Sequence, residues 1–498
     1  MAVNGLADAM AWAQHTFGEL DLGDPRRTRR LVQVAGAIAA DPQASLPRHM
    51  AGEWSALKAV YRLLRADGVS HEAIRGAVCQ QTRQQMQQEP EDGVLLLVHD
   101  DPELDYGYHS ALAGLGPIGN GSHRGFFVHS VLAMGPTQDS ERILGLVHQE
   151  PWVRVPAPRQ RDGGKRSSRE RGERPRESEA WTRAVEQVGP APSRQVWIHV
   201  GDRYADMFAF VQRCRQMGTF FVVRAAQNRR VLVQEHEAQP HLDHLLDCAR
   251  SWPAQATGSI EVPSEHERRA RVAQVQLSWA SMQLLAPENG PEAGSEPLPL
   301  WVLRVWEPQP PDKEVAQREY VPSGKHGSKG KPEVESEQVE ALEGILLSAL
   351  PVDNEQQAWQ VIASSRSRWP IEDLHRGLKT GCRIEQRHLQ EQRSARESTG
   401  RGFSHCRALT ATAQSVPRRA RAGRPGFCRA RGGAGCRHAA GRGGRAPEPQ
   451  AVCEVRGAAG RLSGPQKRWR PRLANALERL AALTLLRCRH AFRHFYRS

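Results

Sequence analysis

Apolar residues recur at helical spacing through the first 90 residues of the chain. The spacing predicts helices over 6–17, 26–39, 53–65 and 71–88. Asp24-Pro25 supports the start of the second helix, because aspartate is a favoured N-cap and proline a favoured first helical residue. The pattern therefore predicts an α-helical domain over residues 1–90.

After Gly93 the pattern changes from helical spacing to short apolar runs. Strands are predicted over 94–98, 106–108, 125–134, 142–148, 195–200 and 220–224. Helices are predicted over 179–188 and 204–217. Because strands alternate with helices, residues 91–227 are predicted to form the first part of an α/β core.

Residues 228–350 carry short β-rich segments separated by stretches rich in Pro, Gly and Glu, which predicts a β-rich insertion with long loops. The helical pattern returns at Asn354 and runs towards Cys382, so 351–397 is predicted to return to the core. Residues 398–498 form an irregular tail rich in Arg, Gly and Ala.

The composition excludes several classes of protein. No run of about 18 apolar residues occurs, so we expect no membrane span. The first residues lack the pattern of a secretion leader, and the nine cysteines include no CxxC pair. We therefore expect a protein of the reducing cytoplasm, without a disulfide scaffold or a cysteine zinc site.

The net charge of +14 is distributed unevenly along the chain. Residues 398–498 contain 21 Arg, 1 Lys, 3 Glu and no Asp, whereas the first 397 residues have a net charge of −5. The composition alone therefore indicates nucleic-acid binding only through the tail.

Three acidic residues are candidates for a metal site. Asp100 and Asp202 follow predicted buried strands, where sites form in open α/β sheets, and Glu372 lies on a predicted helix after Trp369-Pro370. Together they could hold two divalent cations about 4 Å apart, and carboxylates suit Mg²⁺ or Mn²⁺. The alternative is that each acid is an ordinary loop or capping residue.

Basic residues accompany two of the predicted helices. Glu372, His375, Arg376 and Lys379 share one helical face, which suits binding of metal and phosphate together; a surface salt-bridge ladder is the alternative. Arginines also crowd the start of the helix at 26–39, where a nearby phosphate would offset their repulsion by the helix dipole. A solvated basic face is the alternative there.

Four groups of residues, in order along 10–395, resemble cut-and-paste DNA transposases of the transposon-five type, in the insertion-sequence-four family of the DDE superfamily. The first is Leu22-Gly23-Asp24-Pro25-Arg26-Arg27-Thr28-Arg29-Arg30-Leu31 with the segment 58–62, and the second is Leu95-Leu96-Leu97-Val98-His99-Asp100 with 124–130. The third is Asp202-Arg203-Tyr204-Ala205-Asp206 with 221–224, and the fourth is Arg368-Trp369-Pro370-Ile371-Glu372 through Cys382.

The resemblance implies a ribonuclease-H-like catalytic core with a β-rich insertion, preceded by the helical domain that binds transposon ends. It implies that Asp100, Asp202 and Glu372 hold two Mg²⁺ or Mn²⁺ ions, with Arg368 and Lys379 as further catalytic residues. It also implies a homodimer that cuts and joins double-stranded DNA in the bacterial cytoplasm, associated with the nucleoid when bound to DNA. The implied DNA-binding residues are Arg26, Arg27, Arg30, Arg62, Arg224, His375 and Arg376.

The chain departs from the family pattern at three points within the core. Ser365 stands where the family has a phosphate-contacting tyrosine, and Gly344 stands where a tryptophan stacks on a flipped base. Asp101-Pro102 replaces the small hydroxyl residues that usually follow the first acid.

The tail departs further. Gly, Ala and Arg make up 52 of the last 101 residues. When this segment is back-translated, a reading frame that starts one nucleotide later permits an apolar helix and a family-like ending. We expect a frameshift near 392–398 that removes the dimerising region and leaves the cutting activity of this copy uncertain. The alternatives are a non-catalytic end-binding inhibitor of an intact transposase, and a general nucleic-acid binder that acts through an Arg-rich tail.

Overall fold

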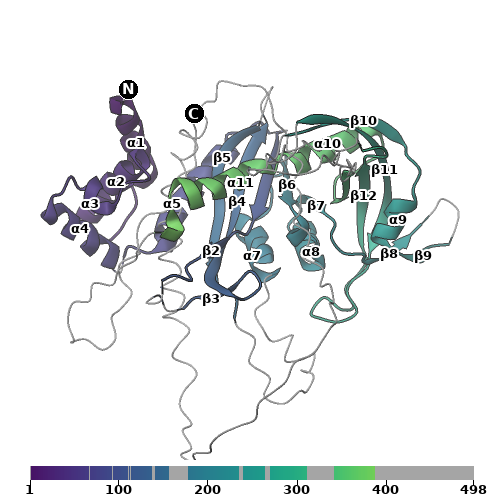
Figure 1. Ribbon diagram of the computed structural model, residues 1–498, viewed down its shortest axis with the longest axis horizontal. Helices are drawn as coiled ribbons and strands as arrows, with labels where there is room; N and C mark the ends of the chain where they lie inside the picture. The colour runs from purple at the N-terminus through teal and green to yellow at the C-terminus, as the bar shows by residue number, and fades with distance from the viewer. Residues whose placement is uncertain are drawn as a thin grey trace, which may run out of the picture.

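The computed structural model describes residues 2–66, 68–91, 93–109, 112, 114–136, 141–155, 178–234, 239–263, 270–310 and 341–386. The expected tail at 398–498 lies outside these residues. The chain has a mixed α/β architecture, with a helical region at its N-terminus and one large mixed sheet (Figure 1). No helix in the described ranges is long and apolar enough to cross a membrane.

The N-terminal region contains helices throughout, as the apolar spacing predicts. Its elements are α1 (Ala2–Phe17), α2 (Pro25–Ala40), α3 (Leu46–His49), α4 (Trp54–Arg65) and α5 (His71–Gln87). The Asp24 side chain accepts a hydrogen bond from the Arg26 backbone N–H (2.8 Å) and so caps α2. Ser70 caps α5 in the same way through Ala73. The short helix α3 was not apparent from the sequence pattern.

All strands of the described chain belong to a single 13-stranded sheet. Its strands are β1 (Val94–Asp100), β2 (Glu103–Asp105), β3 (Gly116–Ile118), β4 (His123–Pro136), β5 (Glu141–Trp152), β6 (Val196–Gly201), β7 (Phe220–Arg224), β8 (Arg230–Val233), β9 (His241–His244), β10 (Ala256–Val262), β11 (Arg271–Leu284), β12 (Leu298–Trp306) and β13 (Glu343–Ser348). The strand order is β2-β4-β1-β6-β7-β13-β12-β11-β8-β9, with β3 and β5 on β4 and β10 on β11.

The centre of the sheet is parallel. β1 pairs with β6 and β6 with β7, in a register that places Val98 opposite Val200 and Val200 opposite Val222. On the other side, β4 runs antiparallel to both β1 and β5. The carboxyl ends of β1, β6 and β7 therefore lie together at one edge of the sheet.

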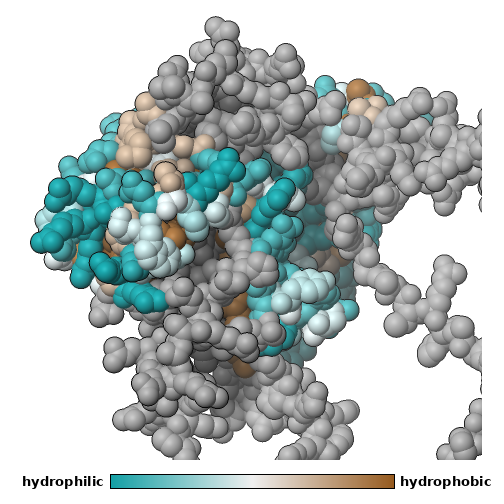
Figure 2. Space-filling model, turned by 60° about the vertical axis from the view of Figure 1, so that its left-hand side comes forward, coloured by the Kyte–Doolittle hydropathy of each residue, from teal (hydrophilic) through white to brown (hydrophobic). Residues whose placement is uncertain are grey.

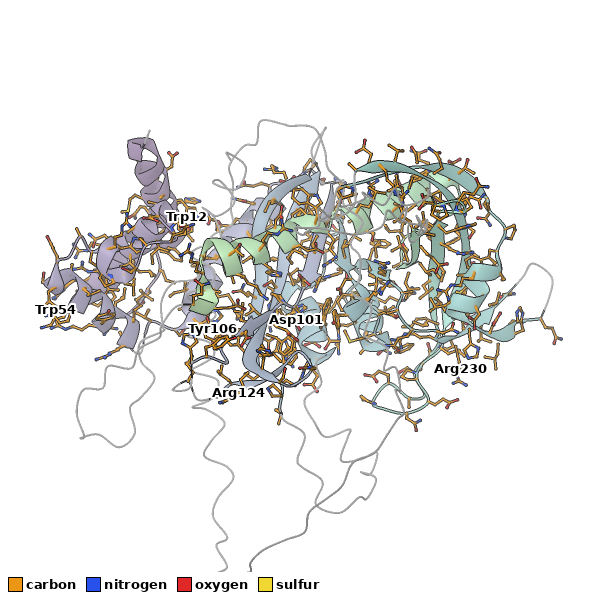
Figure 3. All side chains as sticks on the ribbon, viewed as in Figure 1. Trp12, Trp54, Asp101, Tyr106, Arg124 and Arg230 are labelled. Carbon is orange, nitrogen blue, oxygen red and sulfur yellow. The ribbon has the colours of Figure 1, made fainter. Side chains whose placement is uncertain are left out.

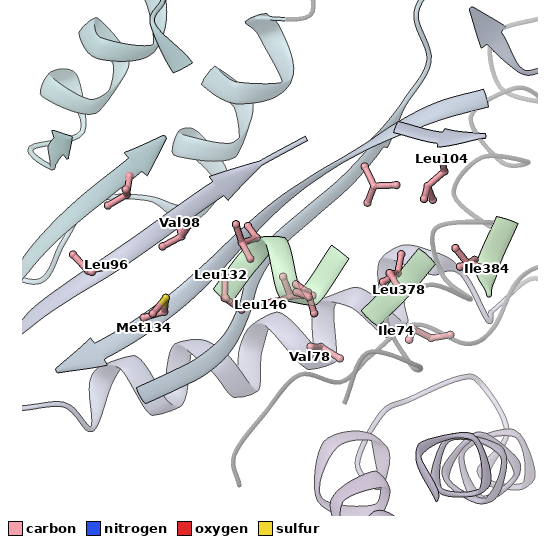
Figure 4. Close-up of a cluster of buried hydrophobic side chains, with 14 of the residues drawn as sticks. Ile74, Val78, Leu96, Val98, Leu104, Leu132, Met134, Leu146, Leu378 and Ile384 are labelled. Atoms are coloured by element: carbon pink, nitrogen blue, oxygen red, sulfur yellow. The ribbon is translucent and has the colours of Figure 1, made fainter. Parts of the chain in front are cut away.

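Alternation along the strands divides the core into two faces. Leu96 and Val98 of β1 belong to the same buried cluster as Ile371 and Leu374 of α11 (Trp369–Arg376), and Figure 4 shows part of this cluster. Leu95 of β1 packs in another cluster with α7 (Ser178–Val188). Even-numbered residues of β1 thus face the layer that contains α11, and Asp100 is on that face.

The strands between 228 and 350 extend the central sheet. β13 pairs with β7, with Leu347 opposite Val223, and β12, β11, β8 and β9 follow in order. β10 lies against α10 (Glu355–Arg366), where a Cβ on Gly258 would collide with the indole of Trp359. The expected β-rich segments are therefore strands of the core sheet itself.

Two expected helices differ from those observed. The stretch from Asn354 to Cys382 is divided into α10, α11 and a π-helical turn, η2 (Gly377–Gly381), followed by η3 (Ile384–Gln386). α10 ends at Arg366 with Ser367 as its C-cap, and Pro370 takes a first-turn position in α11, where its missing N–H costs nothing. The helix expected from 204 begins later, as α8 (Phe208–Gln216), because Asp202 caps a separate 3₁₀ turn, η1 (Arg203–Ala205). The remaining helix, α9 (Leu245–Ser251), was not expected.

Candidate functional site

Three carboxylates meet at the carboxyl edge of the parallel strands. Asp100 is the last residue of β1, and Asp202 directly follows β6, so the pairing of these strands sets the two acids on neighbouring strand ends. Glu372 extends from α11, which packs on the same face of the sheet. The charges of Asp100 and Glu372 both act on Asp202, so the three carboxylates lie close enough to influence one another.

Arg368 lies between two of these acids. Its Nη1 is 3.6 Å from Oδ1 of Asp100, and its Nη2 donates to Oε1 of Glu372. The guanidinium side chain is only 12% exposed. Its delocalised charge therefore offsets the repulsion among the carboxylates in a partly buried setting.

His375 approaches Asp100 from the same helix. Its Nδ1 lies 2.9 Å from Oδ2 of Asp100. Burial raises the pKa of Asp100, but the hydrogen bond from His375 and the charges of His375 and Arg368 outweigh it and lower that pKa to about 2. Asp100 is therefore ionised throughout the physiological pH range.

The pKa of Asp202 is shifted in the opposite direction, above its ordinary value. Burial is the main cause that raises its pKa, and the charges of Asp100 and Glu372 add to it, while Arg368 and the Tyr204 N–H oppose it. Oδ1 of Asp202 accepts the backbone hydrogen bond of Tyr204 at 2.9 Å. A further positive charge near Asp202 would thus be favoured.

The donor types fit a hard divalent cation, because the three acids supply only carboxylate oxygens. In the described part of the chain, no three His, Cys, Asp or Glu side chains are already arranged as a metal centre. Arg368 now provides the positive charge that a cation would otherwise bring. The site therefore fits such an ion in chemistry, with Arg368 as its competitor.

The other residues expected near the acids have separate environments. His375 is buried under Asp100, whereas Arg376 is exposed and pairs with Asp373 at 2.9 Å. Lys379 lies in the π-helical turn, 3.8 Å from Glu385. Residues 372, 375 and 376 of the expected common face lie in α11, whereas Lys379 lies in η2, whose π-helical geometry shifts its position relative to that face.

Arg224 belongs to the same sheet edge as the acids. It ends β7, and its Nη2 donates to the carbonyl of Glu343 at 3.2 Å. The even-numbered position of Arg224 matches that of Val222, which packs in the cluster below α11. The side chain is thus placed on the face that also carries Asp100.

Departures from the family pattern also have defined places. Asp101 accepts hydrogen bonds from Nε1 of Trp152 at 3.1 and 3.0 Å, and so belongs to the packing beside the site. Gly344 pairs with Val305 inside the sheet and has no side chain to offer. Ser365 lies on α10.

The arginines at the start of α2 play different roles. The Arg26 side chain is 86% exposed, and its Nε lies 3.8 Å from Oδ1 of Asp24. Arg27 instead donates from Nη1 to the carbonyl of Leu22 at 2.9 Å, which ties the loop before α2 to the helix. Arg30 is half-buried on the same helix.

A second basic face lies on α4, which sequence reasoning singled out only at Arg62. Trp54, Lys58, Arg62 and Arg65 are all exposed, and the Lys58 Nζ lies 5.1 Å from the centre of the Trp54 ring. Trp54 stands at the outer edge of the N-terminal helices (Figure 3), and the surface brought forward in Figure 2 is largely hydrophilic. In the sequence, this face was indicated by the spacing of its residues, which recur every three or four positions and so share one side of a helix.

A group of buried histidines lies behind the acids and was not anticipated. Nδ1 of His99 is 3.1 Å from Nε2 of His129, and Nε2 of His99 is 2.7 Å from Nδ1 of His199. Trp181 of α7 stacks on His99. Because His99 alternates with Asp100 along β1, the imidazoles occupy the face opposite the acids.

Residues 9–69 match a family model described as transposase DNA-binding. The matched segment covers α2, α3 and α4 and most of α1. The match supports a transposase that binds DNA, and the N-terminal helices are the part of the chain that matches the DNA-binding model.

Proposed function

We propose that this protein is a DDE-type DNA transposase of the insertion-sequence-four kind, which cuts transposon ends and joins them to target DNA. The observation that carries the proposal is the meeting of Asp100, Asp202 and Glu372 at one sheet edge. It occurs in a chain whose residues 9–69 match a transposase DNA-binding family. DNA is thus brought to a site with three carboxylates.

The strand order supports a ribonuclease-H-like core. The order is β5-β4-β1-β6-β7, and only β4 runs against the other four strands. The first two acids then stand at the ends of the two adjacent parallel strands, β1 and β6. The third comes from a helix packed on the same face.

In this function the acids hold two Mg²⁺ or Mn²⁺ ions, which supply activation of the attacking hydroxyl when bound. The protein's own groups orient the DNA. His375 fixes the position of the Asp100 carboxylate, and Arg368 is placed to exchange its contacts with carboxylates for contacts with a phosphate. Arg224, Arg376 and Lys379 would supply further phosphate contacts around the acids.

The N-terminal helices bind double-stranded transposon ends in this proposal. Arg26, Arg30 and Arg62 are positioned on helices within the matched segment, and each exposed cation that neutralises a phosphate adds salt-dependent affinity. The bound protein would be found on the nucleoid. Arg27 contributes chiefly by holding the loop at Leu22.

The proposal includes a frameshift before residue 398, because residues 398–498 are unusually rich in Gly, Ala and Arg. It would remove the region through which a homodimer forms, so this copy would bind ends and, where dimerisation fails, act as an inhibitor of an intact transposase. Resequencing the gene from codon 380 to the stop tests this directly. A confirmed frame with ordinary codon usage through the tail would refute the frameshift.

The catalytic assignment is tested with Glu372→Gln and the matched variant Asp373→Asn on the same helix. We use both the chain as it stands and a version with the tail frame restored, with DNA that spans the ends of its own element. Strand cleavage in Mg²⁺ should be lost with Glu372→Gln and retained with Asp373→Asn. End affinity should change only a few-fold in both. Cleavage that survives Glu372→Gln would refute the assignment.

A further inference from the structure

Tyr204 is an exposed aromatic residue beside the acids. Its residue surface is 75% exposed, although the next two residues, Ala205 and Asp206, are buried. It belongs to η1, the short 3₁₀ turn that leaves the sheet directly after Asp202. The ring is therefore presented to solvent at the edge where the three carboxylates meet.

The backbone below Tyr204 is fixed at both ends. On one side, Oδ1 of Asp202 accepts from the Tyr204 N–H at 2.9 Å, and the Asp202 carbonyl accepts from the Ala205 N–H at 3.1 Å. The acid and the aromatic residue are thus joined through one hydrogen bond. Movement of the turn would displace the carboxylate as well.

On the other side, Asp206 ties the turn to the segment that follows β7. Its Oδ2 accepts from the backbone N–H groups of Ala226 (2.7 Å) and Gln227 (2.8 Å). Its Oδ1 accepts from Nε of Arg229 at 2.9 Å. This network holds the base of the turn while the Tyr204 ring stays outside the core.

An exposed ring on a fixed backbone offers a particular kind of binding surface. Stacking of a nucleobase on an aromatic side chain contributes about 1–3 kcal/mol. It favours an unpaired base, because a base inside a duplex has both faces covered by the neighbouring base pairs. Tyrosine suits such a position, since its ring is apolar and its hydroxyl remains hydrated. The exposed Arg203 beside it adds a positive charge for the adjoining phosphate.

We propose that Tyr204 forms a stacking subsite for an unpaired nucleobase next to the phosphate that the three acids address. The inference rests on the proposed function, since the acids must face DNA for the ring to meet a base. It adds a preference for DNA that is locally unpaired at the reacting end. Duplex DNA without an unpaired base would contact the N-terminal helices but leave Tyr204 unused.

The test measures binding by the full chain, carrying Glu372→Gln so that no strand is cut. The probes are two DNA duplexes of equal length. One has blunt ends, and the other has an unpaired overhang with the fluorescent base 2-aminopurine at its first position. We expect the overhang probe to bind about 5-fold more tightly or better, and its fluorescence to be quenched on binding.

Substitutions separate stacking from a general loss of binding. Tyr204→Phe should keep the preference and the quenching, whereas Tyr204→Leu, which is apolar but cannot stack, should lose both. Leu242→Ala is the control, because Leu242 is 63% exposed on β9 at the far end of the strand order. That variant should behave as the parent chain does.

The outcomes distinguish the two proposals. If both probes bind equally, or if Tyr204→Leu keeps the preference, the stacking subsite is wrong while DNA binding stands. If the chain binds neither probe at low salt, the proposed transposase function is overturned, and the subsite with it.

Discussion

Nδ1 of His375 lies 2.9 Å from Oδ2 of Asp100, and this bond joins α11 to the end of β1. The two residues are far apart in sequence, and both are largely buried at the bond. A carboxylate at a strand end is thus oriented by an imidazole from the helix that carries Glu372. The relative placement of two of the three acids depends on this contact.

Replacing His375 should therefore destabilise the fold as well as the site. We expect His375→Leu to lower the free energy of unfolding by about 1–3 kcal/mol, because the buried Asp100 carboxylate loses a hydrogen-bond partner. Urea unfolding at neutral pH measures the change. Arg376→Gln, at the exposed neighbouring position, should cost less than about 1 kcal/mol; equal effects of the two variants would contradict this explanation.

The buried pair of Asp206 and Arg229 should matter far more for stability than a surface pair. Asp206 is buried and accepts from two backbone N–H groups as well as from Arg229. We expect Asp206→Ala to cost about 3–5 kcal/mol, because Arg229 would lose its carboxylate partner and keep only the backbone carbonyl of residue 206. Removing Glu186, whose pair with Arg213 is exposed, should cost less than about 1 kcal/mol in the same unfolding experiment.

Arg26 and Arg27 should separate DNA binding from stability. Arg26→Ala should weaken DNA binding and reduce the slope of log affinity against log salt by about 0.9 if it contacts one phosphate, with no change in melting temperature. Arg27→Ala should lower the free energy of unfolding by about 1 kcal/mol, through loss of the bond to the Leu22 carbonyl. If Arg26→Ala lowered stability and Arg27→Ala weakened DNA binding instead, the roles assigned to the two arginines would be wrong.

The buried histidines predict a loss of stability in acid. Burial lowers the pKa of His71, His129 and His199 from 6.5 to about 3. Above pH 6.5 both folded and unfolded chains hold these groups neutral; below it the unfolded chain takes up protons that the folded chain does not. The free energy of unfolding should therefore fall between pH 6.5 and 3, by about 1.4 kcal/mol per pH unit for each histidine.

The variant that tests this pH dependence is His129→Leu, which removes one titrating group and fills the buried position with an apolar side chain. Urea unfolding at several pH values should show a shallower slope for it, by about one proton. His241→Asn, on the exposed end of β9, is the control and should keep the parent slope. An unchanged slope for His129→Leu would mean that other groups govern acid unfolding.

Local sequence patterns predicted most of the elements of this fold, because helical and strand periodicity reflect which face of each element is buried. The strand at 220–224 and the helix ending at Arg65 coincide with the observed bounds. Asp100 and Asp202 could be placed near each other because both follow apolar runs typical of parallel strands. Their positions at one edge follow from the pairing of β1 with β6.

Other features depend on contacts between distant residues, which local patterns do not record. The helical spacing around Glu372 continued past Gly377, but the chain turns there into a π-helix, which shifts Lys379 relative to the expected face. Arg27 has the same local setting as Arg26, yet only the fold brings the Leu22 carbonyl within reach of its side chain. The histidine group needed three strands to be aligned before its members could meet.

The pairing of β7 with β13 joins the β-rich region, residues 228–350, to the part of the sheet that carries Asp100 and Asp202. Three residue pairs connect the two strands, from Leu346 with Arg224 to Ser348 with Val222. Removing residues 228–350 would leave β7 with an open edge of unpaired backbone groups, immediately beside Arg224. A shortened chain would thus expose a strand for association with other copies, so the β-rich region cannot be excised as an appendage.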